Sequence, residues 1–137
     1  AVDQGGTAIQ GVLDKDIASH AGGSMNKKSI GIEMNGKPTV NPGKGLEGKY
    51  SEMYNENIIE ATARLIAQLA TKYNIPIDRT GIRGHYEIDP RRRFDPGRNS
   101  GWQNRINKDG TPKEDIPPGN YFDWDDFLTR VKNAVGT

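Results

Sequence analysis

The chain has 137 residues, about the length of one domain. Its net charge of +1, from 19 basic and 18 acidic residues, argues against nucleic-acid binding driven by overall charge. The absence of cysteine excludes disulfides, thiolate metal ligands and a cysteine nucleophile. No apolar run approaches membrane-spanning length, and the first residues lack the pattern of a signal peptide.

Short strands are predicted in the first quarter of the chain, over residues 7–13, 17–23 and 29–34. The last of these has the clearest pattern, because Ile30, Ile32 and Met34 alternate with Gly31 and Glu33. Alternation of this kind is typical of a strand with one buried face.

The rest of the chain is predicted to hold two helices and one further strand, at 52–73, 124–135 and 80–84. Ser51 and Asp123 are the expected N-caps, and Asn74 should end the first helix. Residues 98–121 are polar and rich in turn signals, and are expected to form an inserted loop. Strands interleaved with helices indicate a mixed α/β domain, although the predicted sheet is incomplete at its N-terminal end.

The most informative motif runs from Gly84 to Gly97 and places His85 ten positions before Asp95. Both residue types are good zinc ligands, and a zinc site with an open position activates water at neutral pH. Three consecutive arginines, 91–93, lie between them and suit an anionic substrate or a developing oxyanion. The alternative is a surface loop with a solvated basic run.

Two other hydrolase chemistries can be considered from the residues. A Ser-His-Asp triad using Ser19, Ser24 or Ser29 is disfavoured because no Gly-x-Ser-x-Gly motif is present. A glycosidase could use Glu33 and Asp95 as its carboxylate pair, if their separation suits one.

Three single residues each have a structural and a functional interpretation. Glu33 either faces solvent from a half-exposed sheet or faces a site. His20 is either a loop histidine held by backbone hydrogen bonds or a ligand. Trp102 is either an anchor for the inserted loop or a platform for stacking a sugar.

Several blocks, in the right order, resemble the type 2 N-acetylmuramoyl-L-alanine amidases, a family that includes phage endolysins, cell-wall amidases and peptidoglycan recognition proteins. The blocks are Gly6 to Gln10, Ser19 to Gly22, Ser29 to Glu33, Gly84 to Pro90, Asp95 to Gly97 and Phe122 to Trp124. The resemblance implies an α/β fold with a single mixed central β-sheet flanked by helices, and one amidase-like domain over residues 1–137.

The resemblance also implies roles for individual residues. His85 and Asp95 match the family's second and third zinc ligands. Glu33 matches the acidic residue that orients or deprotonates the attacking water. Arg93 falls where many members place a lysine that stabilises the oxyanion, and arginine keeps the charge but offers a planar fork.

Other positions are implied to contact substrate. His20 matches a groove histidine that is not normally a ligand, and Asn26 and Ser29 lie where the family lines the approach to the groove. Arg91 is a candidate for binding stem-peptide carboxylates and Trp102 for stacking on sugar, although a solvated basic loop and a loop anchor remain the alternatives for these two residues.

One family feature is missing from the sequence. The first zinc ligand of the family is a histidine on a strand upstream of the Gly6-Thr7 block, and this chain starts after that strand. Three explanations stay open: a longer precursor whose N-terminal segment remains associated, a fragment of the whole protein, or His20 as a substitute ligand.

The resemblance therefore predicts a Zn²⁺-dependent hydrolase that cleaves the amide between N-acetylmuramic acid and L-alanine in peptidoglycan. Its partners would be muropeptides, and a separate N-terminal segment that completes the fold, with no nucleic acid and no membrane. It would act outside the cell, in the cell wall or periplasm, or from a phage on the host wall. The alternative is a peptidoglycan-binding module without catalysis.

Overall fold

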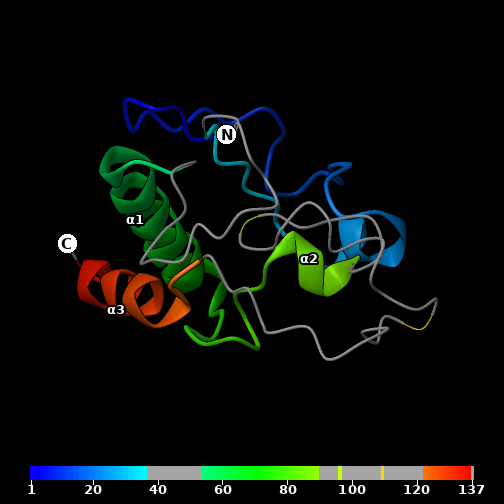
Figure 1. Ribbon diagram of the computed structural model, residues 1–137. Helices are drawn as coiled ribbons and strands as arrows, with labels where there is room; N and C mark the ends of the chain where they lie inside the picture. Colours follow the sequence, from blue (N-terminus) through cyan, green and yellow to red (C-terminus); the bar gives the residue numbers. More distant parts are fainter. Residues whose placement is uncertain (37–53, 90–95, 97–108, 110–121, 137) are drawn as a thin grey trace.

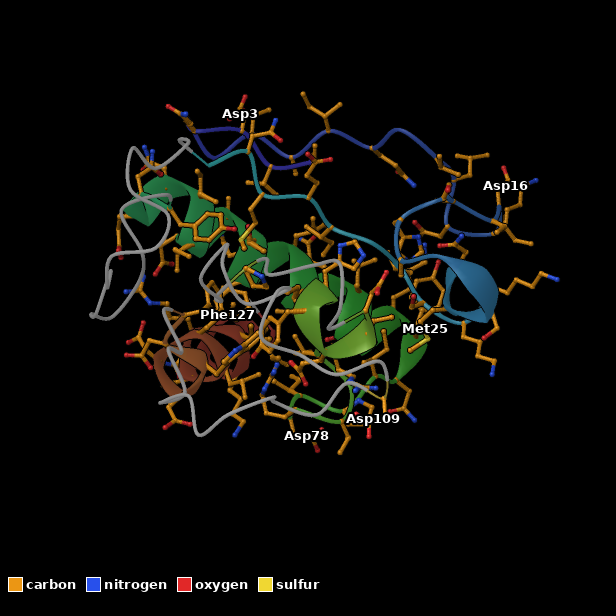
Figure 2. The ribbon with its side chains drawn as sticks, turned by 45° about the vertical axis from the view of Figure 1, so that its right-hand side comes forward. Asp3, Asp16, Met25, Asp78, Asp109 and Phe127 are labelled. Carbon is orange, nitrogen blue, oxygen red and sulfur yellow. The ribbon has the colours of Figure 1, made fainter. Side chains whose placement is uncertain are left out.

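The computed structural model describes residues 1–36, 54–89, 96, 109 and 122–136. Its helical elements are η1 (Gly23–Lys27, a 3-10 helix), α1 (Glu56–Tyr73), α2 (His85–Ile88) and α3 (Trp124–Ala134). In Figure 1, α1 and α3 lie side by side at one end of the molecule and η1 lies at the other, with α2 between them. Figure 2 keeps this order, with Phe127 on α3 and Met25 in η1.

The expected single mixed central β-sheet is wrong for the described residues, which contain no β-strand. These residues contain two isolated β-bridges, antiparallel between Val2 and Ala8 and parallel between Val2 and Met34. The Val2 amide donates to the Glu33 carbonyl at 2.8 Å, and the Asn35 amide donates to the Val2 carbonyl at 2.8 Å. Val2 thus joins two extended segments. On the side of Ala8, Ala1 and Ile9 exchange two backbone hydrogen bonds of 2.8 Å, and the Asp3 amide donates to the Thr7 carbonyl at 3.0 Å.

Segment 29–34 is extended with one side toward the core, although it is not a strand. Ile32 and Met34 pack against the core and Gly31 and Glu33 are exposed, as predicted, but Ile30, expected on the inner face, is 40% exposed. The segment lacks the row of neighbouring hydrogen bonds that defines a strand. The hydrophobic periodicity therefore predicted the buried and exposed faces of residues 31–34 correctly, but the secondary structure incorrectly.

The other strand predictions also fail. Residues 7–13 and 17–23 carry exposed apolar side chains, namely Ile9, Val12, Leu13 and Ile17, and so have no covered face to pack as a sheet. Residues 80–84 begin in a turn, because Asp78 Oδ1 accepts hydrogen bonds from the amides of Thr80 at 2.8 Å and Gly81 at 3.1 Å. Such an aspartate turn competes directly with extended pairing.

Helix α1 begins later than predicted and ends where expected. Its N-cap is Asn55, whose Oδ1 accepts from the Ile58 amide at 2.9 Å, while the expected cap Ser51 lies outside the described residues. Asn74 follows the last turn in the left-handed conformation, with φ of 55°. Asparagine tolerates this conformation better than most residues and closes the helix.

Helix α3 begins as the sequence predicts. Asp123 is its N-cap, and the carboxylate accepts from the Asp126 amide at 2.9 Å. Trp124, Phe127 and Val131 face the core, whereas Val135, in the last position of the predicted helix, is 43% exposed. Val135 is extended and lies just past the helix end, so the helical periodicity no longer applies to it.

The core is formed between α1, α3 and the N-terminal segment. Its largest fully buried side chains are Phe122, Ile58, Ile59, Val2 and Val131. At the start of α3, the Phe122 ring packs edge-on against Trp124 and Phe127. No helix in the described part of the chain is long and apolar enough to cross a membrane.

Candidate active site

The loop before η1 is organised by one side-chain oxygen. Asn26 Oδ1 accepts hydrogen bonds from three successive backbone amides, at 3.0 Å from His20, 2.9 Å from Ala21 and 3.0 Å from Gly22. Asn26 was predicted to contact substrate, and in the structure its Oδ1 is engaged in shaping the loop. It thereby fixes the backbone from which the His20 side chain extends.

The His20 ring is held at both nitrogens. Nδ1 lies 2.9 Å from the Ala18 carbonyl oxygen, and Nε2 lies 2.8 Å from Ser29 Oγ. A carbonyl oxygen only accepts, so Nδ1 donates a hydrogen to the Ala18 carbonyl. The Ser29 hydroxyl donates to the Met25 carbonyl at 2.8 Å.

His20 packs directly on the extended segment that carries Glu33. A Cβ added at Gly31 would stand 2.4 Å from His20 Cγ, so the ring occupies the space in front of Gly31. Residues two apart on an extended segment point to the same side. The His20 ring and the Glu33 carboxylate therefore lie on the same, exposed face of this segment.

His85 is the first residue of α2 and is partly buried. Its carbonyl accepts from the Asp89 amide at 3.0 Å, which closes the turn. Gly84 precedes it as N-cap, and the Gly84 amide donates to Glu87 Oε1 at 3.0 Å. The start of this short helix is therefore tied to a side chain three residues further on.

The residues next to the two expected zinc ligands contact each other. A Cβ at Gly84, which precedes His85, would stand 3.0 Å from Pro96 Cδ, and Pro96 follows Asp95 in the sequence. Gly84 and Pro96, the chain neighbours of His85 and Asp95, therefore lie close together. Asp95 itself lies outside the described residues, as do Arg91, Arg93 and Trp102.

Among the described residues, no group of three His, Cys, Asp or Glu side chains could hold a metal ion. The described part of the chain thus supplies His85 but no complete ligand set. His20, considered as a substitute ligand, has contacts at both ring nitrogens with the Ala18 carbonyl and Ser29. The ligand pair His85 and Asp95 stays a prediction.

The structure brings together His20, Asn26 and Ser29, and places Glu33 on the same face as His20. It also reveals residues that the sequence analysis missed, namely Arg79 and Glu87, which contact each other beside α2. A signal for Glu87 was available, because a glutamate at the third helical position is typical of a capping arrangement. Arg79 lies in a turn and carried no comparable signal.

A protein-family profile matches most of the chain. The profile of the N-acetylmuramoyl-L-alanine amidase family matches residues 1–98, well over half of the chain. The chain belongs to this family. Membership indicates an amidase-type hydrolase acting on peptidoglycan, and the matched region includes Glu33, His85 and Asp95. No curated protein and no solved structure matches the chain significantly.

Proposed function

We propose that this amidase is zinc-dependent and cleaves the amide between the lactyl group of N-acetylmuramic acid and L-alanine of the stem peptide. The observation that carries the proposal is the family match over residues 1–98, which spans the expected catalytic and ligand positions. The contact between Gly84 and Pro96 supports it, because these residues adjoin His85 and Asp95.

In this proposal His85 and Asp95 hold the Zn²⁺ ion, together with a ligand not yet assigned. When bound, zinc supplies Lewis acidity, which polarises a carbonyl and lowers the pKa of a bound water. Families of this chemistry typically require three protein ligands. A separate N-terminal segment is one proposed source of the third.

Glu33 takes the proton from the attacking water and passes it to the leaving amine of L-alanine. Its exposed position on the extended segment leaves the carboxylate accessible to substrate. Arg93 stabilises the negative oxygen of the tetrahedral intermediate, a role that contributes about 3 kcal/mol in comparable sites.

His20 and Ser29 line the approach to Glu33, because the His20 ring lies in front of Gly31 on the same face. Arg91 and Trp102 extend the binding surface toward stem-peptide carboxylates and sugar. Since peptidoglycan lies outside the cytoplasmic membrane, we propose that the protein acts in the cell wall or periplasm, or on a host wall if phage-encoded.

The test is to incubate the full chain with purified muropeptides and zinc and to label newly formed amino groups. Amidase action creates a free α-amino group on L-alanine, whereas a glycosidase would create reducing sugar ends. Glu33→Gln should remove this release while leaving zinc content unchanged. Glu60→Gln is the matched control, since Glu60 lies on α1 and contacts Arg130.

Two results would contradict the proposal. Release that continues undiminished in Glu33→Gln, or after chelation, would reject the assigned chemistry. Binding of cell walls without zinc and without release would instead favour the peptidoglycan-binding module.

A further inference from the structure

A chain of contacts links helix α3 to the start of α2. The Arg79 guanidinium carbon lies 3.3 Å from the centre of the Trp124 ring, a close stacked arrangement. Arg79 Nη1 donates to the Ile82 carbonyl at 2.6 Å, and Nη2 forms an ion pair with Glu87 Oε1. The same Glu87 oxygen accepts from the Gly84 amide at 3.0 Å.

A second contact joins the same two helices. Trp124 Nε1 donates to the Tyr86 hydroxyl at 3.1 Å, in a buried position. Tyr86 and Trp124 are 7% and 8% exposed, so water has little access to this bond. Trp124 therefore holds α2 directly through Tyr86 and indirectly through Arg79 and Glu87.

Helix α2 has only four residues, and a single turn is not stable alone, because nucleation costs more than one turn of hydrogen bonds returns. Its geometry must come from the contacts around it. Partial burial lowers the pKa of Arg79 below its ordinary value, while its side chain remains 32% exposed. The Glu87 carboxylate offsets part of the hydration that the guanidinium loses where it packs on Trp124.

His85 lies in the middle of these contacts. Gly84, Tyr86 and Glu87 are each fixed by bonds or close packing, and a Cβ at Gly84 would stand 2.7 Å from Tyr86 Cε1. The backbone on both sides of His85 therefore has little freedom. The direction in which the imidazole leaves α2 follows from that backbone.

We infer that the Arg79–Glu87 ion pair, stacked on Trp124, is a positioning device that fixes the orientation of His85. Glu87 and Arg79 act through the backbone of α2 and do not touch substrate. The inference rests on the proposed function insofar as His85 is a zinc ligand, while the effect on the His85 ring itself can be measured without metal. Residues that orient metal ligands commonly change metal affinity by about ten- to a hundredfold.

The experiment uses the full chain and four variants. Glu87→Ala removes the cap and the ion pairs of Glu87 with Arg79 and with Arg83, whose Nε lies 3.8 Å from Oε2. Glu87→Gln keeps an oxygen for the Gly84 amide, and Arg79→Lys changes the Arg79 pair alone, keeping the charge but losing the planar guanidinium. Glu60→Ala is the matched control, because it breaks a different Arg–Glu contact, to Arg130, between α1 and α3.

The first measurement is metal-free. Amide exchange of Gly84 and Asp89 should become about tenfold faster in Glu87→Ala, as expected for weakened local structure. The His85 ring resonances should shift and broaden in Glu87→Ala and Arg79→Lys, and recover partly in Glu87→Gln. Glu60→Ala should leave both readouts as in the wild type.

The second measurement is a zinc titration. Apparent zinc affinity should fall about tenfold in Glu87→Ala and be unchanged in Glu60→Ala. Unaltered His85 resonances and exchange in both Glu87→Ala and Arg79→Lys would overturn the inference. If the wild-type chain binds no zinc, the proposed metal chemistry fails, and the His85 ring signals still decide whether the pair positions this residue.

Discussion

The His20 ring occupies the space that a side chain at Gly31 would need, with its Cγ 2.4 Å from the position of an added Cβ. This packing places the imidazole on the exposed face of the extended segment. Gly31, which the ring covers, is two residues before Glu33. A glycine at position 31 is therefore required for this arrangement of the candidate site.

Gly31→Ala should displace the His20 ring and break its contact with Ser29 Oγ. The clash is with the base of the ring, including Cβ at 2.6 Å, so rotation of the side chain alone cannot relieve it. We expect a loss of muropeptide affinity together with about 1–3 kcal/mol of stability, typical of overpacking. Isothermal titration and chemical denaturation measure both quantities.

Gly11→Ala is the control for that change, because no atom lies within 4 Å of a Cβ at Gly11. It should leave affinity and stability close to wild type. Wild-type binding by Gly31→Ala would show that the contact between His20 and the extended segment has no part in recognition.

Asn26→Ala should loosen the loop from His20 to Gly22, since three amides lose their shared acceptor. Each lost hydrogen bond costs on the order of 1 kcal/mol, although partly exposed amides recover some of it from water. Faster amide exchange at Ala21 and Gly22 is the expected signature. Asn26→Asp keeps the acceptor oxygen and should retain slow exchange; equal exchange in the Ala and Asp variants would contradict the role of Oδ1.

Protonation of Asp14 in acid should lower the free energy of unfolding. The Tyr73 hydroxyl donates to Asp14 Oδ2 at 2.6 Å and Lys72 Nζ lies 3.2 Å away, and these contacts lower the pKa of Asp14. A carboxylate with a depressed folded-state pKa stabilises the protein above its unfolded pKa of about 3.9, and this contribution disappears as pH falls through the folded pKa.

Thermal melts of wild type and Asp14→Asn should therefore differ at neutral pH and converge in acid. Asp16→Asn, two residues away on the same exposed segment, is the control. A difference in melting temperature that persists unchanged to about pH 2 would rule out titration of Asp14 as its cause.

Phe122→Ala should destabilise the core strongly. Phe122 is 1% exposed, and its ring centre lies 4.6 Å from Trp124, 5.1 Å from Phe127 and 6.1 Å from Tyr54. Loss of a buried aromatic ring typically costs about 3–5 kcal/mol. Urea denaturation measures it, and the exposed Val135→Ala should stay within about 0.5 kcal/mol of wild type; comparable losses in the two variants would contradict the packing.

The sequence predicted helix ends well where they depend on hydrogen bonds and backbone conformations of neighbouring residues. Asp123 caps α3 and Asn74 ends α1 as expected, because cap and left-handed positions depend on the residue itself. The alternation in segment 29–34 correctly separated Glu33 from Ile32 and Met34.

The expected sheet is absent from the described residues, because a strand forms only when another segment pairs with it, and local composition does not reveal that partner. Segment 7–13 has strand-like composition, yet Ile9 and Leu13 are more than half exposed and only Ala8 forms a bridge. In the candidate site, sequence indicated His20 and Glu33, but the contacts of Arg79 with Trp124 and Glu87 join residues distant in sequence and required the structure.

The length of segment 29–34 is as important as its side chains. Backbone hydrogen bonds with Val2 hold Glu33 and Asn35 in place, so removing one residue between Ser29 and Ile32 would reverse the faces of the residues before the gap. The exposed face of the segment would then lose the position that Gly31 holds in front of the His20 ring. Insertions and deletions here should consequently be far more damaging than most single substitutions.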